Sequence, residues 1–219
     1  MILSTGAELR VTGEGGAAVV CLNGGQASEV AGTWSATVEW LVARLAPRFP
    51  DLRIAQVRYR IKSWHQFDGC IADAHAAIAE VGASRTLLLG FSMGGGVSIA
   101  CAGESPVTGV LGLAPWIPDR LPVEQLRGKR LRVLHGSLDR PLPGVPGVSP
   151  ELAQRGFDRA RALGVDGELT VIRGAVHGVA VRAPWGGLIP LPRARRWFDL
   201  VSAEVERFAR NEEAGRVSG

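Results

Sequence analysis

Residues 85–96, RTLLLGFSMGGG, decide how this chain folds. An apolar run typical of a buried strand passes into G-x-S-x-G at residues 90–94, and an apolar segment that predicts a helix follows. A strand that turns sharply into a helix brings the flanking backbone together, so Gly90 and Gly94 must lack a Cβ. Ser92 then lies in a strained turn, with its hydroxyl exposed at a helix N-terminus. This context predicts a nucleophilic serine, although in a chain with 29 glycines the motif alone is also compatible with a structural turn.

Apolar strands and helices alternate on both sides of this stretch. Strands are predicted at residues 17–22, 52–59, 85–91, 107–113, 131–135 and 168–172, and helices at 33–48, 68–81, 93–102, 149–163 and 193–209. Thr33 is the expected N-cap of the first helix, and residues 7–12 are expected to add a polar antiparallel edge strand. Six strands interleaved with helices predict an α/β fold, a mostly parallel, doubly wound sheet with helices on both faces.

Length and composition limit the class of protein. The 219 residues suffice for one domain and hardly for two, so we expect a single domain over residues 1–219. Hydrophobic residues make up 46% of the chain and charged residues 21%, which excludes disorder of the whole. No stretch approaches the roughly 18–20 uncharged apolar residues that span a bilayer. The N-terminus carries Glu8 where a secretory signal needs a basic start, and the three cysteines are far apart, so we expect a cytoplasmic protein without a disulfide framework.

The net charge of +4 does not point to a nucleic-acid partner. The 25 basic residues are interspersed with 21 acidic ones, and only Lys62 and Lys129 are lysines. The densest basic cluster, Arg193, Arg195 and Arg196, is explained by a solvated helix face. No nucleic-acid binding is therefore expected, and the sequence does not indicate an oligomeric state.

A serine nucleophile needs a base, and the base needs an orienting acid. Ligands of open α/β sheets bind at the carboxyl ends of the strands, so the loops that follow the strands are the expected places for both. Asp139 follows the strand that ends in His135, and His177 follows the last predicted strand, so both are expected on the same sheet edge as Ser92. The alternatives are less well placed: His65, His75 and His135 among the bases, and Asp158 and Asp166 among the acids. The predicted catalytic residues are therefore Ser92, Asp139 and His177.

Two loops are candidates for an oxyanion hole, which needs two preorganised N–H donors. Met93 follows the serine and can supply one donor. The loop Asn23-Gly24-Gly25-Gln26 is placed to supply the other, from Gly25 or Gln26, although a glycine turn in this position occurs in any α/β fold.

Substrate contacts are harder to read from the sequence. Asn23 and Gly24 lie in the oxyanion loop, and Trp116 follows a strand at the catalytic edge, so these three residues are the candidate substrate contacts. Trp34, Trp64 and Trp185 also lie in or beside loops, but tryptophans are commonly packed for structural reasons. The cations Arg58, Arg60, Lys62 and Arg140 would attract an acidic substrate if they lined the same rim, and exposed arginines usually have no specific role.

GFSMGG at residues 90–95, HGSLDR at 135–140 and AVHG at 175–178, after an NGG loop at 23–25, resemble the α/β-hydrolase superfamily. The resemblance covers residues 7–209 and extends to the small dienelactone-hydrolase-like and carboxylesterase-like branches without a lid domain. It implies Ser92 as the nucleophile, His177 as the base, Asp139 as the acid and Met93 as an oxyanion donor. This chain departs from many members by reading Asn-Gly-Gly for His-Gly-Gly and by having only residues 114–130 where relatives insert a cap.

The function that this resemblance implies is hydrolysis of a small or medium carboxylic ester, thioester or lactone through an acyl-enzyme, with no metal and no organic cofactor. A small-molecule ester is then the expected partner. Two alternatives stay open: an acyltransferase or perhydrolase that uses the same triad, and a non-catalytic member of the fold that binds a ligand or partner.

Overall fold

The computed structural model describes residues 1–140 and 147–217, with side chains as far as Arg210. A seven-stranded sheet forms its centre, in the order β1-β4-β2-β6-β7-β8-β9. All neighbouring pairs are parallel except β1 with β4. The strands are β1 Glu8–Thr12, β2 Ala17–Leu22, β4 Arg53–Arg58, β6 Arg85–Phe91, β7 Val107–Leu113, β8 Arg130–Gly136 and β9 Asp166–Ile172. The predicted mostly parallel sheet and its antiparallel edge strand are confirmed.

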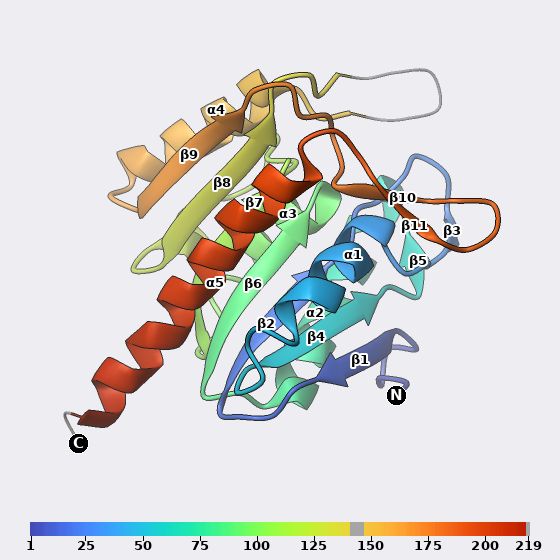
Figure 1. Cartoon of the computed structure of the whole chain (residues 1–219). Coiled ribbons are helices and arrows are strands. Elements are labelled where there is room, and N and C mark those ends of the chain that lie inside the picture. The colour runs from blue at the N-terminus through green and yellow to red at the C-terminus, as the bar shows by residue number, and fades with distance from the viewer. Residues whose placement is uncertain (141–146, 218–219) are drawn as a thin grey trace.

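Helices cover both faces of this sheet. The helices are α1 Ala36–Leu45, α2 Phe67–Val81, α3 Met93–Ala100, α4 Pro150–Ala162 and α5 Ala194–Val217. Helices α1 and α5 pack on one face, in front of the sheet in Figure 1, and α2, α3 and α4 pack on the other. The doubly wound arrangement predicted from the sequence is thus confirmed.

The uninterrupted apolar run of β2 is explained by its place in the sheet. Alternate residues point to opposite faces, so Val19 packs in the core under α1 and α5 and Val20 in the core under α2 and α3. All six residues of β2 are buried. A central parallel strand covered on both faces therefore requires apolar residues at every position.

The start of the first helix differs from the prediction. Helix α1 begins at Ala36, and its N-cap is Ser35, whose Oγ accepts a hydrogen bond from the N–H of Val38 at 3.4 Å. The prediction of Thr33 as N-cap is wrong, because β3 Val30–Ala31 pairs with β5 Ile61–Lys62 and holds the preceding chain extended. The hydroxyl of Thr33 instead accepts a hydrogen bond from the Lys62 ammonium at 2.7 Å.

Two small two-stranded sheets, β3–β5 and β10–β11, lie outside the main sheet. Strands β10 Ala180–Arg182 and β11 Leu188–Pro190 form an antiparallel hairpin within the connection from β9 to α5. Figure 1 shows this hairpin close to β3 and β5. Strands of two or three residues carry too little periodicity to be predicted. Trp185, in the turn of the hairpin, is 79% exposed.

None of the described helices combines the length and apolar character that a membrane crossing requires. Among the described residues, no three or more His, Cys, Asp or Glu side chains cluster as a metal ion would need.

Candidate active site

Ser92 lies in a strained turn between β6 and α3. Its φ of 55° and ψ of −120° are unusual for a residue with a side chain. The turn is held by hydrogen bonds from the Ser92 N–H to the carbonyl of Leu113 and from the Trp116 N–H to the carbonyl of Ser92, both at 2.9 Å. A Cβ on Gly94 would overlap the carbonyl oxygens of Leu22 and Asn23, so only glycine allows this close approach of the helix to β2.

The side chains of Ser92, His177 and Asp139 form a continuous hydrogen-bonded chain. The Oγ of Ser92 lies 3.0 Å from Nε2 of His177, and Nδ1 of His177 lies 2.7 Å from Oδ2 of Asp139. With a proton on Nδ1, the imidazole donates to the carboxylate and accepts from the hydroxyl. Asp139 and His177 follow Ser92 by 47 and 85 positions in the chain. The structure thus brings together the three predicted residues.

The loops that carry the acid and the base bind each other directly. The N–H of Leu138 donates to the carbonyl of Ala175, and the N–H of Gly174 donates to Oγ of Ser137, both at 2.9 Å. Gly136, at the end of β8, is required here, because a Cβ would lie 2.5 Å from the Ala175 carbonyl oxygen. These contacts place Asp139 beside His177.

Thr37, in the first turn of α1, anchors the segment after His177. Its hydroxyl accepts hydrogen bonds from the N–H groups of Val179 at 3.1 Å and Ala180 at 3.4 Å. Behind the imidazole, the ring of Phe91 packs at a centroid distance of 5.1 Å. Sequence reasoning missed Thr37, because nothing in a helix pattern indicates that a loop 142 residues away binds to it.

His135, which the sequence analysis ranked below His177 as a base, is a further residue of the site. It is fully buried, and its Nε2 lies 3.0 Å from Oδ2 of Asp139. The other carboxylate oxygen, Oδ1, accepts a hydrogen bond from the N–H of Val148 at 3.1 Å. Burial raises the pKa of Asp139, but hydrogen bonds from His135 and His177 more than offset it, so the pKa of this carboxyl lies below its usual value. The only signal in the sequence was a histidine four residues before the acid.

Of the other candidate bases and acids, His65 lines a pocket together with Trp64 and Trp116, and the remaining three bind partners other than Ser92. His75 pairs with Glu104 at 2.9 Å, and Asp166 pairs with Arg130 at 2.5 Å. Asp158 accepts a hydrogen bond from Gln154 on α4.

The glycine loop after β2 contacts the turn that holds Ser92. A Cβ on Gly24 would lie 3.3 Å from Cβ of Ser92, and Gly25 packs against the side chain of Met93. Met93 is the first residue of α3, so its N–H has no acceptor within the helix. Gln26 is turned to other partners: its carbonyl accepts from the N–H of Trp64 at 3.1 Å, and its amide donates to Ser28 at 3.2 Å.

Asn23 holds this loop in place through its side chain. The residue is 3% exposed, and its amide nitrogen donates to the carbonyls of Val57 at 2.7 Å and Thr33 at 3.2 Å. Both amide protons are therefore engaged by backbone.

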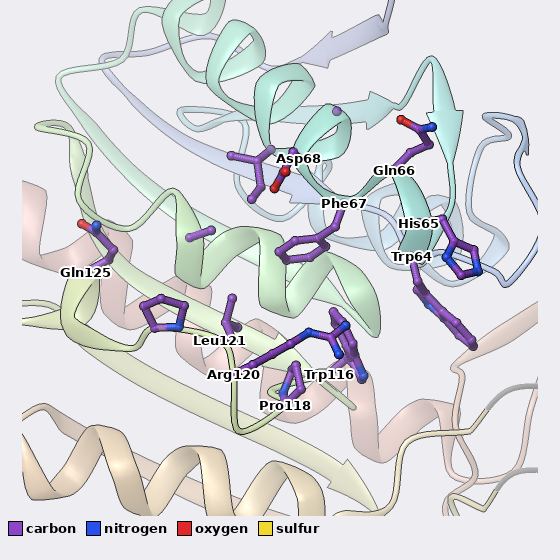
Figure 2. A pocket seen from close by; sticks show the side chains of 14 residues that line it. Trp64, His65, Gln66, Phe67, Asp68, Trp116, Pro118, Arg120, Leu121 and Gln125 are labelled. Atoms are coloured by element: carbon purple, nitrogen blue, oxygen red, sulfur yellow. The ribbon is translucent and has the colours of Figure 1, made fainter.

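An elongated pocket of about 570 Å³ lies between α2, the end of α3 and residues 116–125. Trp64, which packs against Gly25, and Trp116, which follows the Ser92 turn, lie at one end, and Gln125 lies at the other (Figure 2). Phe67 packs edge-on against Trp116 at 5.5 Å, and the guanidinium of Arg120 lies 5.3 Å from the same tryptophan ring. Trp116, whose N–H binds the carbonyl of Ser92, thus belongs to the wall of this pocket, while Ser92 itself does not line it.

No protein-family model and no curated protein matches this sequence significantly. Solved structures do match. A sugar hydrolase, YeeB, from Lactococcus lactis aligns with a TM-score of 0.71 at 15% identity, over 96% of this chain and 98% of that one. The esterase EaEST from Exiguobacterium antarcticum aligns with a TM-score of 0.66 at 15% identity, over 93% and 97%.

A third solved structure, an α/β serine hydrolase without a lid from Xanthomonas campestris, aligns with a TM-score of 0.58 at 17% identity. It covers 81% of this chain and 84% of the other. At such identities the likeness concerns the fold, and it confirms the resemblance found in the sequence at that level.

Proposed function

We propose that this chain, which has the α/β-hydrolase fold without an inserted cap, is a serine hydrolase that cleaves a carboxylic ester. The observation that carries the proposal is the hydrogen-bonded chain from Ser92 through His177 to Asp139 at a strained turn. A strained backbone at the serine lowers the stability of the fold, and a protein that only binds a ligand does not need a serine in this conformation with an oriented imidazole beside it.

In the proposed reaction, Oγ of Ser92 bonds to the ester carbonyl carbon as its proton passes to Nε2 of His177. The carbonyl electron pair moves onto oxygen. When the tetrahedral intermediate collapses, the alcohol oxygen leaves and takes the proton from His177. Water then attacks the acyl-enzyme by the same route, which releases the acid and restores Ser92. Asp139 stays ionised throughout and stabilises the imidazolium.

The developing oxyanion needs two N–H donors, each worth roughly 10²–10³ in rate. Met93 and Gly25 are the proposed donors. The N–H of Met93, at the start of α3, has no acceptor within the helix, and Gly25 packs directly on the Met93 side chain. Gln26, left open by the sequence, is the alternative second donor: its carbonyl and side chain hold the neighbouring loop, and among the described residues its backbone N–H has no hydrogen-bond partner.

The elongated pocket is the proposed site for the acyl group. It adjoins the Ser92 turn through Trp116, whose N–H binds the Ser92 carbonyl, and Ala100 at the end of α3 forms part of its wall. Aromatic and aliphatic side chains form most of its wall, so burial of an apolar chain there is favourable. The proposed substrate is therefore an ester with an acyl group of medium length. Trp116 is its expected contact, together with the backbone of Asn23 and Gly24 beside the serine.

Labelling with a fluorophosphonate tests the function without assuming a substrate. We expect one covalent adduct by intact mass on the parent protein and none on Ser92→Ala. Ser28→Ala, in the exposed loop after the glycine turn, is the matched control and should be labelled like the parent. If neither the parent nor the control forms an adduct, the triad is not functional, and the reading as a binding protein replaces this proposal.

Product analysis separates hydrolysis from acyl transfer. With a 4-nitrophenyl ester as donor, a hydrolase releases mainly the free acid, whereas an acyltransferase or perhydrolase gives mainly a new ester with added alcohol or a peracid with added peroxide. Predominant transfer at millimolar acceptor would contradict hydrolysis as the main reaction.

A further inference from the structure

A second cavity, of about 400 Å³, is lined by Asn23, Gly24 and Gly25 of the glycine loop, and none of these residues lines the elongated pocket. Gly24 and Phe91 form its inner wall, and both contact the reacting groups: Gly24 packs on Ser92, and the Phe91 ring packs on His177. The outer wall comes from Thr33 and Trp34, the start of α1, Lys62 of β5 and Arg182 of β10. The small sheets missed by sequence reasoning therefore build this cavity.

The charged side chains that line this cavity are all cationic. Lys62 and Arg182 line it, and no acidic residue does so among the described residues. Arg182 is bound to Glu39 and to the carbonyl of Gly186. Lys62 donates to the neutral hydroxyl of Thr33, and within the described residues no carboxylate lies within ion-pair distance of it. Burial lowers the pKa of Lys62, and no neighbouring carboxylate opposes that effect.

The aromatic wall of this cavity is also surrounded by cations. Arg10 stacks over the ring of Trp34 at 3.9 Å, and Arg58 lies 5.7 Å from the same ring. Glu39 pairs with Arg10 and Arg182, and Glu8 pairs with Arg58, so two carboxylates face four cations including Lys62. The excess positive charge favours an anion in the cavity.

We propose that this cavity binds a carboxylate on the alcohol part of the ester, with Lys62 as the residue that determines this specificity. The inference rests on the proposed function and names its substrate class: an ester with an apolar acyl chain and an anionic leaving group. The position of the cavity beside His177 assigns it to the alcohol part of the ester. Phe91 lines it and packs on His177, and His177 is the group that delivers the proton to the departing alcohol oxygen.

The test compares two butanoate esters that differ in charge, 4-(butanoyloxy)benzoate and the neutral 4-(butanoyloxy)benzamide. We expect kcat/KM of the parent to be about tenfold higher for the benzoate. Lys62→Gln should lower kcat/KM for the benzoate about tenfold, mainly through KM, and leave the benzamide within twofold. Lys62→Arg should retain most of the preference. Because each variant is compared on both esters, the different reactivity of the two leaving groups cancels.

Lys129→Gln serves as the matched control. Lys129 is the only other lysine and precedes β8 at the opposite end of the strands, where it binds the carbonyl of Val107. This variant should keep the parent's preference. A third ester, phenyl hemiglutarate compared with phenyl pentanoate, carries the anion on the acyl side. If Lys62→Gln affected that pair and spared the benzoate, the assignment to the alcohol part would be wrong.

The outcomes distinguish this inference from the proposed function. Ser92-dependent hydrolysis of both butanoates with a ratio that Lys62→Gln leaves unchanged would overturn the anion site and leave the hydrolase intact. If no ester is cleaved and no fluorophosphonate adduct forms, calorimetric titration with 4-hydroxybenzoate decides. Binding that is lost in Lys62→Gln would support the anion site without catalysis, and absence of binding to the parent would overturn it.

Discussion

The Nε2 atom of His135 lies 3.0 Å from Oδ2 of Asp139, the same oxygen that lies 2.7 Å from Nδ1 of His177. His135 Nε2 also lies 2.9 Å from the carbonyl of Val148, whose own N–H donates to Oδ1 of Asp139. Besides His177, two groups that do not contact Ser92 thus hold the Asp139 carboxylate: Nε2 of His135 at Oδ2 and the N–H of Val148 at Oδ1. We interpret His135 as a positioning residue, which keeps Asp139 ionised and correctly oriented toward His177.

Replacing His135 tests this role. His135→Phe keeps an aromatic ring in the buried site and removes the donor, so we expect kcat to fall about 10- to 100-fold. Without this hydrogen bond the pKa of Asp139 rises toward its usual value, so the loss of stability in acid should begin at a higher pH than in the parent. His135→Gln, which retains a donor, should recover part of the activity. If His135→Phe had the kcat of the parent and lost stability in acid at the same pH as the parent, His135 would only fill space.

The depressed pKa of Asp139 also predicts a pH dependence of stability. The folded state binds the proton less tightly than the unfolded state, so the stabilisation is complete above the unfolded pKa of about 3.9. It is lost as the pH falls through the lower folded value. Urea unfolding of the parent and of Asp139→Asn between pH 2.5 and 6 should show the parent more stable near pH 6 and the difference shrinking toward low pH. A difference that does not change with pH would contradict the depressed pKa.

Two glycine substitutions, one in the turn at Ser92 and one in α2, should have opposite effects on stability. Gly94→Ala introduces a methyl group into the carbonyls of Leu22 and Asn23, and we expect the free energy of unfolding to fall by about 2–3 kcal/mol. Gly69→Ala, in the first turn of α2, meets nothing closer than 3.9 Å and should raise it by up to about 1 kcal/mol. Chemical denaturation of both variants checks the pair. Equal effects would show that the turn tolerates a side chain.

A substitution at Ala100 tests whether the elongated pocket holds the acyl chain. This residue ends α3 and lines the elongated pocket. Ala100→Leu should fill its far part, so we expect kcat/KM for 4-nitrophenyl octanoate to fall about tenfold, while the acetate changes less than twofold. The ratio of the two rates is the readout. Equal losses on both esters would place the acyl chain elsewhere.

Much of the fold could be predicted because its signals are local. The apolar runs at residues 17–22 and 85–91 agree with β2 and β6, since a central parallel strand must be apolar at every position. Thr33 failed as an N-cap because its conformation is set by the pairing of β3 with β5, a contact between short segments about 30 residues apart. Local pattern carries no information about such pairing.

The sequence by itself determined the strand and helix order, and with it the sheet edge on which Ser92, Asp139 and His177 stand. That follows because parallel strands carry their next loops to a common end. Only the tertiary structure decided which groups support them: His135 on the acid, Thr37 on the loop of the base, and Lys62 in a cavity built by two short sheets. These contacts join segments far apart in the chain, and their partners are chosen by packing and hydrogen bonding in three dimensions.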